Sequence, residues 1–94
     1  PEMGASVAPL LESMRAGGRK TLAAVARRAH AAGARPECVV VEDFGGRVAD
    51  AIVKQAKKWR ADLIVMGTHG RRGVQRALLG SDAELVLRYS PVPV

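Results

Sequence analysis

The run ADLIVMGTHGRRG, residues 61–73, decides the fold that this sequence predicts. It places four consecutive apolar residues, 63–66, directly before a segment with three glycines. A short continuous apolar run that ends at glycine is typical of a strand covered on both faces, as in parallel sheets. We therefore predict a buried strand over residues 63–66, followed by a glycine-rich loop.

Before this run, a long stretch carries apolar residues at helical spacing. Residues 9–32 place Leu, Met, Val and Ala three to four positions apart, which predicts a helix. Gly17 and Gly18 each cost about 1 kcal/mol relative to alanine, so this is one helix with a weak point or two shorter helices. Gly33 is placed to cap its carboxyl end, and residues 1–8 are expected to form a loose lead-in.

A second β-branched run, Cys38–Glu42, predicts another strand buried on both faces, with Cys38 in the core. Residues 47–59 predict a helix whose solvent-facing side carries an i,i+4 ion pair between Asp50 and Lys54. Its core-facing stripe is expected to consist of Val48, Ala49, Ile52, Val53, Ala56 and Trp59. A third helix is expected from Gly80-Ser81 to about Tyr89, opened by a Ser81–Glu84 capping box. Residues 90–94 are expected to enter one more strand.

The order helix, strand, helix, strand, loop, helix and strand stub defines the predicted fold class. Such alternation predicts an α/β fold with a parallel sheet, flanking helices and right-handed crossovers. Two strands and a stub are too few for a stable doubly wound sheet. We therefore expect at least the first, central strands to lie before Pro1.

Composition limits the classes of function. The apolar fraction of 48% rules out a disordered chain, and one cysteine excludes an intrachain disulfide. The apolar runs are shorter than a membrane span requires, so no membrane partner is expected. A net charge of +6 favours anionic partners, although many basic proteins have none. Lys54, Lys57, Lys58 and Arg60 are expected to form a solvated face, and a core-facing Trp59 argues against nucleic-acid binding.

The spacing Gly67-x2-Gly70-x9-Gly80-Ser81 carries the predicted chemistry. Glycine allows the backbone to approach a ligand closely, and a loop after a strand can turn successive N–H groups toward an anion. The amino terminus of the helix at Ser81 adds unpaired N–H donors and the positive end of the helix dipole. This pattern predicts a phosphate site.

Catalytic and metal-binding alternatives have less support. His69 lies within the glycine-rich segment, where a general base would act, but no companion nucleophile follows at a recognisable spacing. A histidine that lines the loop is therefore favoured. No cluster of His, Cys, Asp and Glu has the spacing of metal ligands, and the lysine of the classical phosphate loop is absent. We predict no catalytic residues, no enzyme activity and no metal site.

The run at 61–73, with LLGS at 78–81 and RYSPVPV at 88–94, resembles the nucleotide-binding branch of the universal stress protein family. That resemblance implies a Rossmann-like parallel fold, of the adenine nucleotide alpha hydrolase-like type, for one domain over residues 1–94. It implies a cytoplasmic homodimer joined through the carboxyl-terminal strand. The ligand is expected to be ATP, with Mg²⁺ as a further component. The implied binding residues are Met66, Gly67, Gly70, Gly80, Ser81 and Asp82.

Two departures from the family pattern keep an alternative open. The family usually has a small or apolar residue where this chain has Asp82, whose carboxylate opposes a polyphosphate unless Mg²⁺ or an arginine offsets it. Arg71, Arg72 and Arg76 are close enough in sequence to do so. The family also uses an Asp at the end of its first strand, which has no counterpart here. A dimerising interaction module that binds no nucleotide is the first alternative, and a basic nucleic-acid-binding domain is the less favoured second one.

Overall fold

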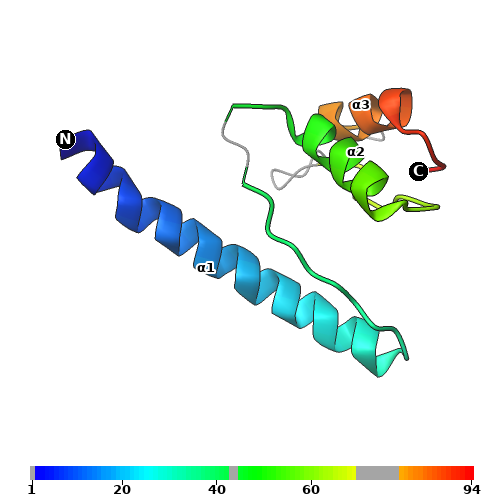
Figure 1. Cartoon of the computed structure of the whole chain (residues 1–94), viewed down its shortest axis with the longest axis horizontal. Coiled ribbons are helices and arrows are strands. Elements are labelled where there is room, and N and C mark those ends of the chain that lie inside the picture. Colours follow the sequence, from blue (N-terminus) through cyan, green and yellow to red (C-terminus); the bar gives the residue numbers. More distant parts are fainter. Residues whose placement is uncertain (1, 43–44, 70–78) are drawn as a thin grey trace. The chain divides into compact units, whose positions relative to one another are not determined.

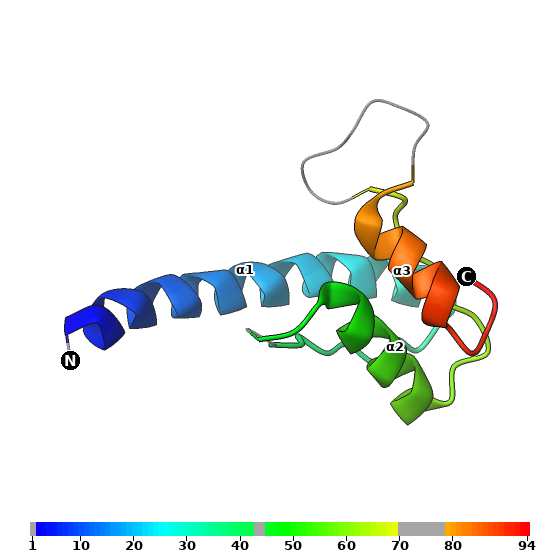
Figure 2. The same cartoon turned by 90° about the horizontal axis from the view of Figure 1, so that it is seen from above.

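The computed structural model of this chain describes residues 2–42, 45–69 and 79–94, with side-chain surroundings from residue 7 onward. The chain divides into an amino-terminal unit, Pro1–Glu42, and a carboxyl-terminal unit, Asp43–Val94. The amino-terminal unit contains helix α1, Glu2–Ala31, and the carboxyl-terminal unit contains α2, Val48–Trp59, and α3, Ser81–Tyr89 (Figures 1 and 2). Each unit is described by itself below.

Helix α1 is a single helix that passes through Gly17 and Gly18 without a break. It begins at Glu2, so the predicted loose lead-in over residues 1–8 is wrong, because the helix extends past Pro9 toward the amino terminus. The predicted cap at Gly33 is confirmed. Gly33 has φ +91°, and the Ala34 N–H donates to the Ala29 carbonyl at 2.9 Å, which closes a Schellman motif.

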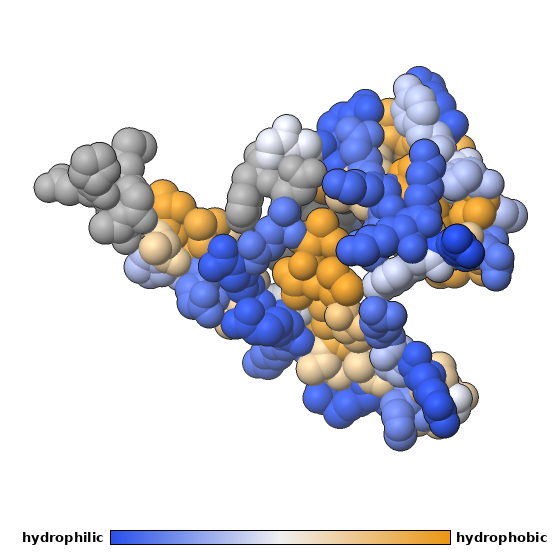
Figure 3. All heavy atoms as spheres, in the orientation of Figure 1, coloured by the Kyte–Doolittle hydropathy of each residue, from blue (hydrophilic) through white to orange (hydrophobic). Residues whose placement is uncertain are grey.

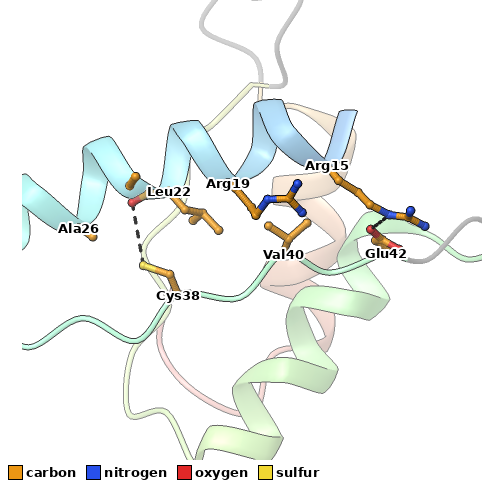
Figure 4. A pocket seen from close by; sticks show the side chains of 8 residues that line it. Arg15, Arg19, Leu22, Ala26, Cys38, Val40 and Glu42 are labelled. Carbon is orange, nitrogen blue, oxygen red and sulfur yellow. Dashed lines mark hydrogen bonds and ion pairs between the residues drawn. The ribbon is translucent and has the colours of Figure 1, made fainter. Parts of the chain in front are cut away.

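After Gly33 the chain turns and runs back along α1 as an extended segment, residues 34–42 (Figure 1). Val40 lies over Gly18, where an added Cβ would be 3.6 Å from both Val40 methyl groups. Farther along, the Arg15 guanidinium forms an ion pair with Glu42 (Figure 4). Contacts with a single helix cover only one side of this segment.

The predicted burial of residues 38–42 is therefore wrong. Val39 is 42% and Val41 50% exposed, and hydrophobic surface is open to solvent along this segment (Figure 3). Cys38 is also exposed, and its thiol lies 4.0 Å from the Leu22 carbonyl oxygen. The segment has the β-branched composition of a strand. Within the described part of this unit, however, no second layer packs on it and buries these side chains.

The carboxyl-terminal unit contains the hydrophobic core. Helices α2 and α3 pack on each other and on the extended residues 61–66. Val86 of α3 is fully buried, and the other buried side chains are Ala49, Val53, Ala56, Ile64 and Ala83. The apolar spacing of residues 47–59 thus predicted α2 within one residue. Its ends were wrong as core positions, because Val48 is 57% and Trp59 44% exposed.

Helix α2 ends through a residue in the left-handed region. Arg60 has φ 52° and ψ 46°, and its N–H donates to the carbonyls of Ala56 and Lys57. The Ala61 N–H then donates to the Ala56 carbonyl at 2.9 Å. This is the Schellman pattern, with arginine at the position where glycine is usual. The turn directs the following residues back across the core.

The predicted Rossmann-like α/β fold with a parallel sheet is wrong for this structure, because the described residues form three helices and no strand. A strand requires a ladder of backbone hydrogen bonds with a neighbour. Residues 61–66 show one such bond to other extended backbone, from the Ile64 N–H to the Pro93 carbonyl at 2.9 Å. Ile64 is buried while Val65 is 86% exposed, so one face of this segment is covered and the other is open.

The predicted last strand over residues 90–94 is likewise not formed in the described structure. The Ser90 hydroxyl donates to the Val92 carbonyl at 2.6 Å and accepts from the Val92 N–H at 3.1 Å. These bonds fix the chain beyond α3, whose predicted end at Tyr89 is confirmed. Among the described helices, none is long and apolar enough to cross a membrane. The single domain over residues 1–94 stays a prediction.

Candidate functional site

The end of the extended segment and the start of α3 meet through a backbone hydrogen bond. The Gly80 N–H donates to the Thr68 carbonyl at 2.6 Å. Gly67 and Thr68 follow directly on Met66, which is half-buried and packs against the core. The carboxyl-terminal core therefore holds both ends of the segment between Thr68 and Gly80.

Gly80 is required there because of space. Its φ of −66° is open to any residue. A Cβ at Gly80, however, would lie 2.8 Å from the Thr68 carbonyl oxygen and 3.2 Å from the His69 Cα. Both neighbours are backbone atoms, so a side chain at this position forces the two chain segments apart. The Gly80-Ser81 step of the sequence pattern thus begins at a position where two backbone segments are in contact.

Helix α3 starts with uncapped amides. Gly80 is the N-cap and has no side chain with which to cap, and the first bond of the helix runs from the Glu84 N–H to the Gly80 carbonyl at 2.9 Å. The amides of Ser81, Asp82 and Ala83 precede that bond, so they lack a partner within the helix. The predicted capping box is wrong, because Ser81 is the first helical residue and not the cap.

Two carboxylates lie in the same turn of α3. Asp82 is half-buried and Glu84 is exposed. Glu84 lies 3.7 Å from the Arg88 guanidinium, one turn farther along, in a pair whose side chains are 61–62% exposed. Such an exposed pair contributes little to stability. Acidic residues near a helix amino terminus favour the helix dipole, and they also repel an incoming anion.

The structure brings four of the predicted residues to one place and leaves one outside the description. Gly67, Gly80, Ser81 and Asp82 gather where the extended segment meets α3, and Met66 supports them from the core. Gly70 lies outside the described residues, as do Arg71, Arg72 and Arg76. The sequence reasoning missed Thr68, because its contribution is a backbone carbonyl, for which side-chain identity gives no signal.

His69 continues the same segment. Its Nδ1 lies 3.1 Å from the Thr68 hydroxyl oxygen, so the two neighbouring side chains pair with each other. The role of His69 in shaping the loop stays a prediction, because residues 70–78 lie outside the described structure.

A groove of about 230 Å³ adjoins these residues. Gly67 and Thr68 line one end, and most of the remaining lining is apolar, from Leu63, Val65, Leu79, Leu87 and Val94. No group of three or more His, Cys, Asp or Glu side chains that could hold a metal occurs within the described residues. The site as described thus combines backbone donors, two carboxylates in the first turn of α3 and an apolar groove.

The sequence matches the Universal stress protein family over residues 1–94. The chain belongs to the universal stress protein family. It is 40% identical over 83 residues to a universal stress protein of Methanocaldococcus jannaschii, an alignment that covers 88% of this chain and 47% of the relative. The comparisons therefore support a universal-stress-protein-like function.

Two further relatives match shorter stretches. Universal stress protein A homolog 2 of Coxiella burnetii is 56% identical over 36 residues, 38% of this chain and 24% of that protein. A universal stress protein of Methanothermobacter thermautotrophicus is 47% identical over 49 residues, 52% of this chain and 33% of that protein. The chain thus spans less than half the length of these relatives. No solved structure matches it.

Proposed function

We propose that this universal stress protein chain binds an adenine nucleotide, with the phosphates at the amino terminus of α3. One observation carries the proposal: the Gly80–Thr68 hydrogen bond closes the glycine-rich segment onto a helix that begins with three amides lacking helical partners. Backbone N–H groups at a helix amino terminus, together with the positive end of its dipole, favour phosphate.

The groove beside Gly67 supports the same proposal. It offers an apolar surface next to the proposed phosphate position, and a nucleotide base needs such a surface. In the proposal Met66 and Gly67 contribute backbone on one side, Ser81 contributes its hydroxyl, and Gly70 contributes from the segment that is not described. The function is regulatory binding, in a cytoplasmic homodimer, and includes no catalytic step.

Asp82 sets the charge requirement of this site. Its carboxylate lies in the first turn of α3, so it opposes a triphosphate unless a cation offsets it. Mg²⁺ prefers oxygen ligands and usually binds through one or two carboxylates together with substrate phosphates. The Asp82 carboxylate and the Ser81 hydroxyl fit that donor set. The alternative function, a dimerising module that binds no nucleotide, is favoured by this same carboxylate.

The first test is calorimetric titration of the chain with ATP and Mg²⁺, with AMP as the comparison. Gly80→Ala is expected to weaken ATP binding at least about tenfold, because the new Cβ separates the two ends of the loop. Gly17→Ala is the matched control, since a Cβ there meets nothing within 4 Å. Circular dichroism checks that each variant keeps its helices. Equal ATP affinity in the Gly80→Ala and Gly17→Ala variants would contradict the assignment of the phosphate site to the start of α3.

Asp82→Asn separates binding from folding, because its expected effect is a gain. Without Mg²⁺, removal of the carboxylate should tighten ATP binding about fivefold, corresponding to about 1 kcal/mol of lost repulsion near the helix terminus. If both the unchanged chain and Asp82→Asn are folded and neither binds ATP, the result supports the alternative function, a dimerising module. Release of inorganic phosphate from bound ATP would contradict the absence of catalysis.

A further inference from the structure

The outer face of α2 carries four exposed cations within seven residues: Lys54, Lys57, Lys58 and Arg60. The sequence predicts that Asp50 pairs with Lys54, but in the structure Asp50 accepts two hydrogen bonds from Arg47, both at 3.1 Å. None of the four cations forms an ion pair with another described residue. The α2 cationic face, defined by these four residues, is therefore without a neutralising partner in the described part of the chain.

Trp59 is the last residue of α2 and lies beside this face. The sequence argument against nucleic-acid binding assumed that Trp59 points into the core, but the residue is 44% exposed. It stands between Lys58 and Arg60, where α2 ends. A partly exposed aromatic ring thus stands next in sequence to two of the four cations.

Arg60 follows directly after α2 and ends the helix through its backbone conformation. Its left-handed conformation is one that glycine adopts freely and that arginine adopts at a cost. The Schellman turn that ends α2 accounts for this conformation. Arginine at this position adds a guanidinium directly after the exposed tryptophan.

We propose that the α2 cationic face binds single-stranded nucleic acid, with the cations on successive phosphates and Trp59 stacked on a base. Sequence-tolerant binding of single strands combines these two elements, a positive surface along the backbone and an aromatic platform for the bases. This binding surface is independent of the proposed nucleotide site, because it uses the solvent side of α2.

Other anionic partners fit this face less well. A helix that lies on a membrane inserts an apolar stripe of its own. In α2 the corresponding residues, Ala49, Val53 and Ala56, are buried in the protein core. An acidic peptide would use the cations and leave the exposed ring without a role. Duplex nucleic acid offers its phosphates, but its bases are already stacked.

Trp59 is the only tryptophan of the chain, so its fluorescence reports on this face directly. We expect a 15-nucleotide oligothymidylate at about 50 mM salt to quench this fluorescence saturably. Engagement of four phosphates predicts that the logarithm of the binding constant falls with the logarithm of the salt concentration with a slope of about −3. Trp59→Ala, followed by calorimetry, should weaken binding about tenfold.

The decisive comparison uses two triple variants of equal charge. Lys54→Gln/Lys57→Gln/Lys58→Gln should bind at least about tenfold more weakly, with the slope reduced to about −1. Lys20→Gln/Arg27→Gln/Arg28→Gln removes the same charge from exposed positions of α1 and should change the affinity by less than about threefold. Equal losses in both variants would overturn the proposal. So would an absence of Trp59 quenching, or equally tight binding of oligoglutamate or of phosphatidylserine vesicles.

Discussion

The two compact units of this chain are stabilised in different ways. In the amino-terminal unit, every described side chain from residue 7 to residue 42 is exposed or half-exposed, although α1 has 30 residues. In the carboxyl-terminal unit, two shorter helices of 12 and 9 residues bury six side chains between them and the segment 61–66. The first unit is stabilised mainly by the hydrogen bonds of a long helix, and the second mainly by the packing of buried side chains.

This difference follows from the physics of helix formation. Nucleation is costly and propagation is favourable, so a helix well beyond about 15 residues can persist with few tertiary contacts, whereas a helix of about 10 residues cannot. Helices α2 and α3 therefore depend on their common core, and α1 depends mainly on its own hydrogen bonds and its cap at Gly33. Three tests probe that distinction, in decreasing order of expected effect.

The largest effect is expected for Val86→Asp. Val86 is fully buried, so an unpaired carboxylate at this position should destabilise the carboxyl-terminal unit by about 3 kcal/mol or more. Amide hydrogen exchange should then show α2 and α3 unprotected while α1 keeps its protection. Leu10→Asp is the control, because Leu10 is 60% exposed and should tolerate the charge. Equal loss of protection in α1 would mean that the two units do not differ as described.

The sequence predicted the helices well because their spacing is a local property. The ends of α2 and α3, and the cap at Gly33, were predicted within one residue, since caps and apolar periodicity depend on neighbours along the chain. The sheet was not predicted correctly. Residues 63–66 and Cys38–Glu42 have strand composition, but a strand also needs a hydrogen-bonded neighbour, and composition does not say whether one is present.

The candidate site was predicted in part for a similar reason. Gly80 and Ser81 were found from their spacing, and the structure adds why Gly80 is a glycine: the Thr68 backbone occupies the space of a side chain. Thr68 gave no signal, because a carbonyl is common to all residues. Trp59 was assigned to the core because its spacing matches the stripe of α2, but at the last position of a helix the core no longer extends far enough to cover it.

The second effect is of intermediate size and compares the two helix ends. Arg60→Gly should stabilise the carboxyl-terminal unit by about 1 kcal/mol, because glycine adopts the left-handed conformation of Arg60 without steric cost. Gly33→Arg in the amino-terminal unit is the reverse exchange at φ +91° and should destabilise α1 by about 1–2 kcal/mol. Urea denaturation followed by circular dichroism measures both. A loss of stability in Arg60→Gly would show that the Arg60 side chain contributes more than its backbone conformation costs.

The smallest effect is expected at the ion pair between Arg15 and Glu42, which joins α1 to the extended segment after it. The hydrogen bond to Glu42, and then its charge, raise the pKa of Arg15 above its ordinary value. A raised pKa means that this stabilisation is fully present below the pKa of Arg15 in the unfolded chain and is lost only as the pH rises through the folded value. Arg15 should therefore give the amino-terminal unit no pH dependence between about pH 6 and pH 9.

Salt should reveal this pair where pH does not. Both side chains are more than a third exposed, so their attraction is screened in water. We expect the melting temperature of α1, followed by circular dichroism, to fall slightly between about 0.01 M and 1 M salt as the Debye length shrinks from about 30 Å to about 3 Å. Glu42→Gln should remove most of that salt response. Glu12→Gln is the matched control, because Glu12 lies 3.7 Å from the Arg15 guanidinium within α1 itself. A larger effect from Glu12→Gln would mean that the charges stabilise the helix locally and do not hold the extended segment against it.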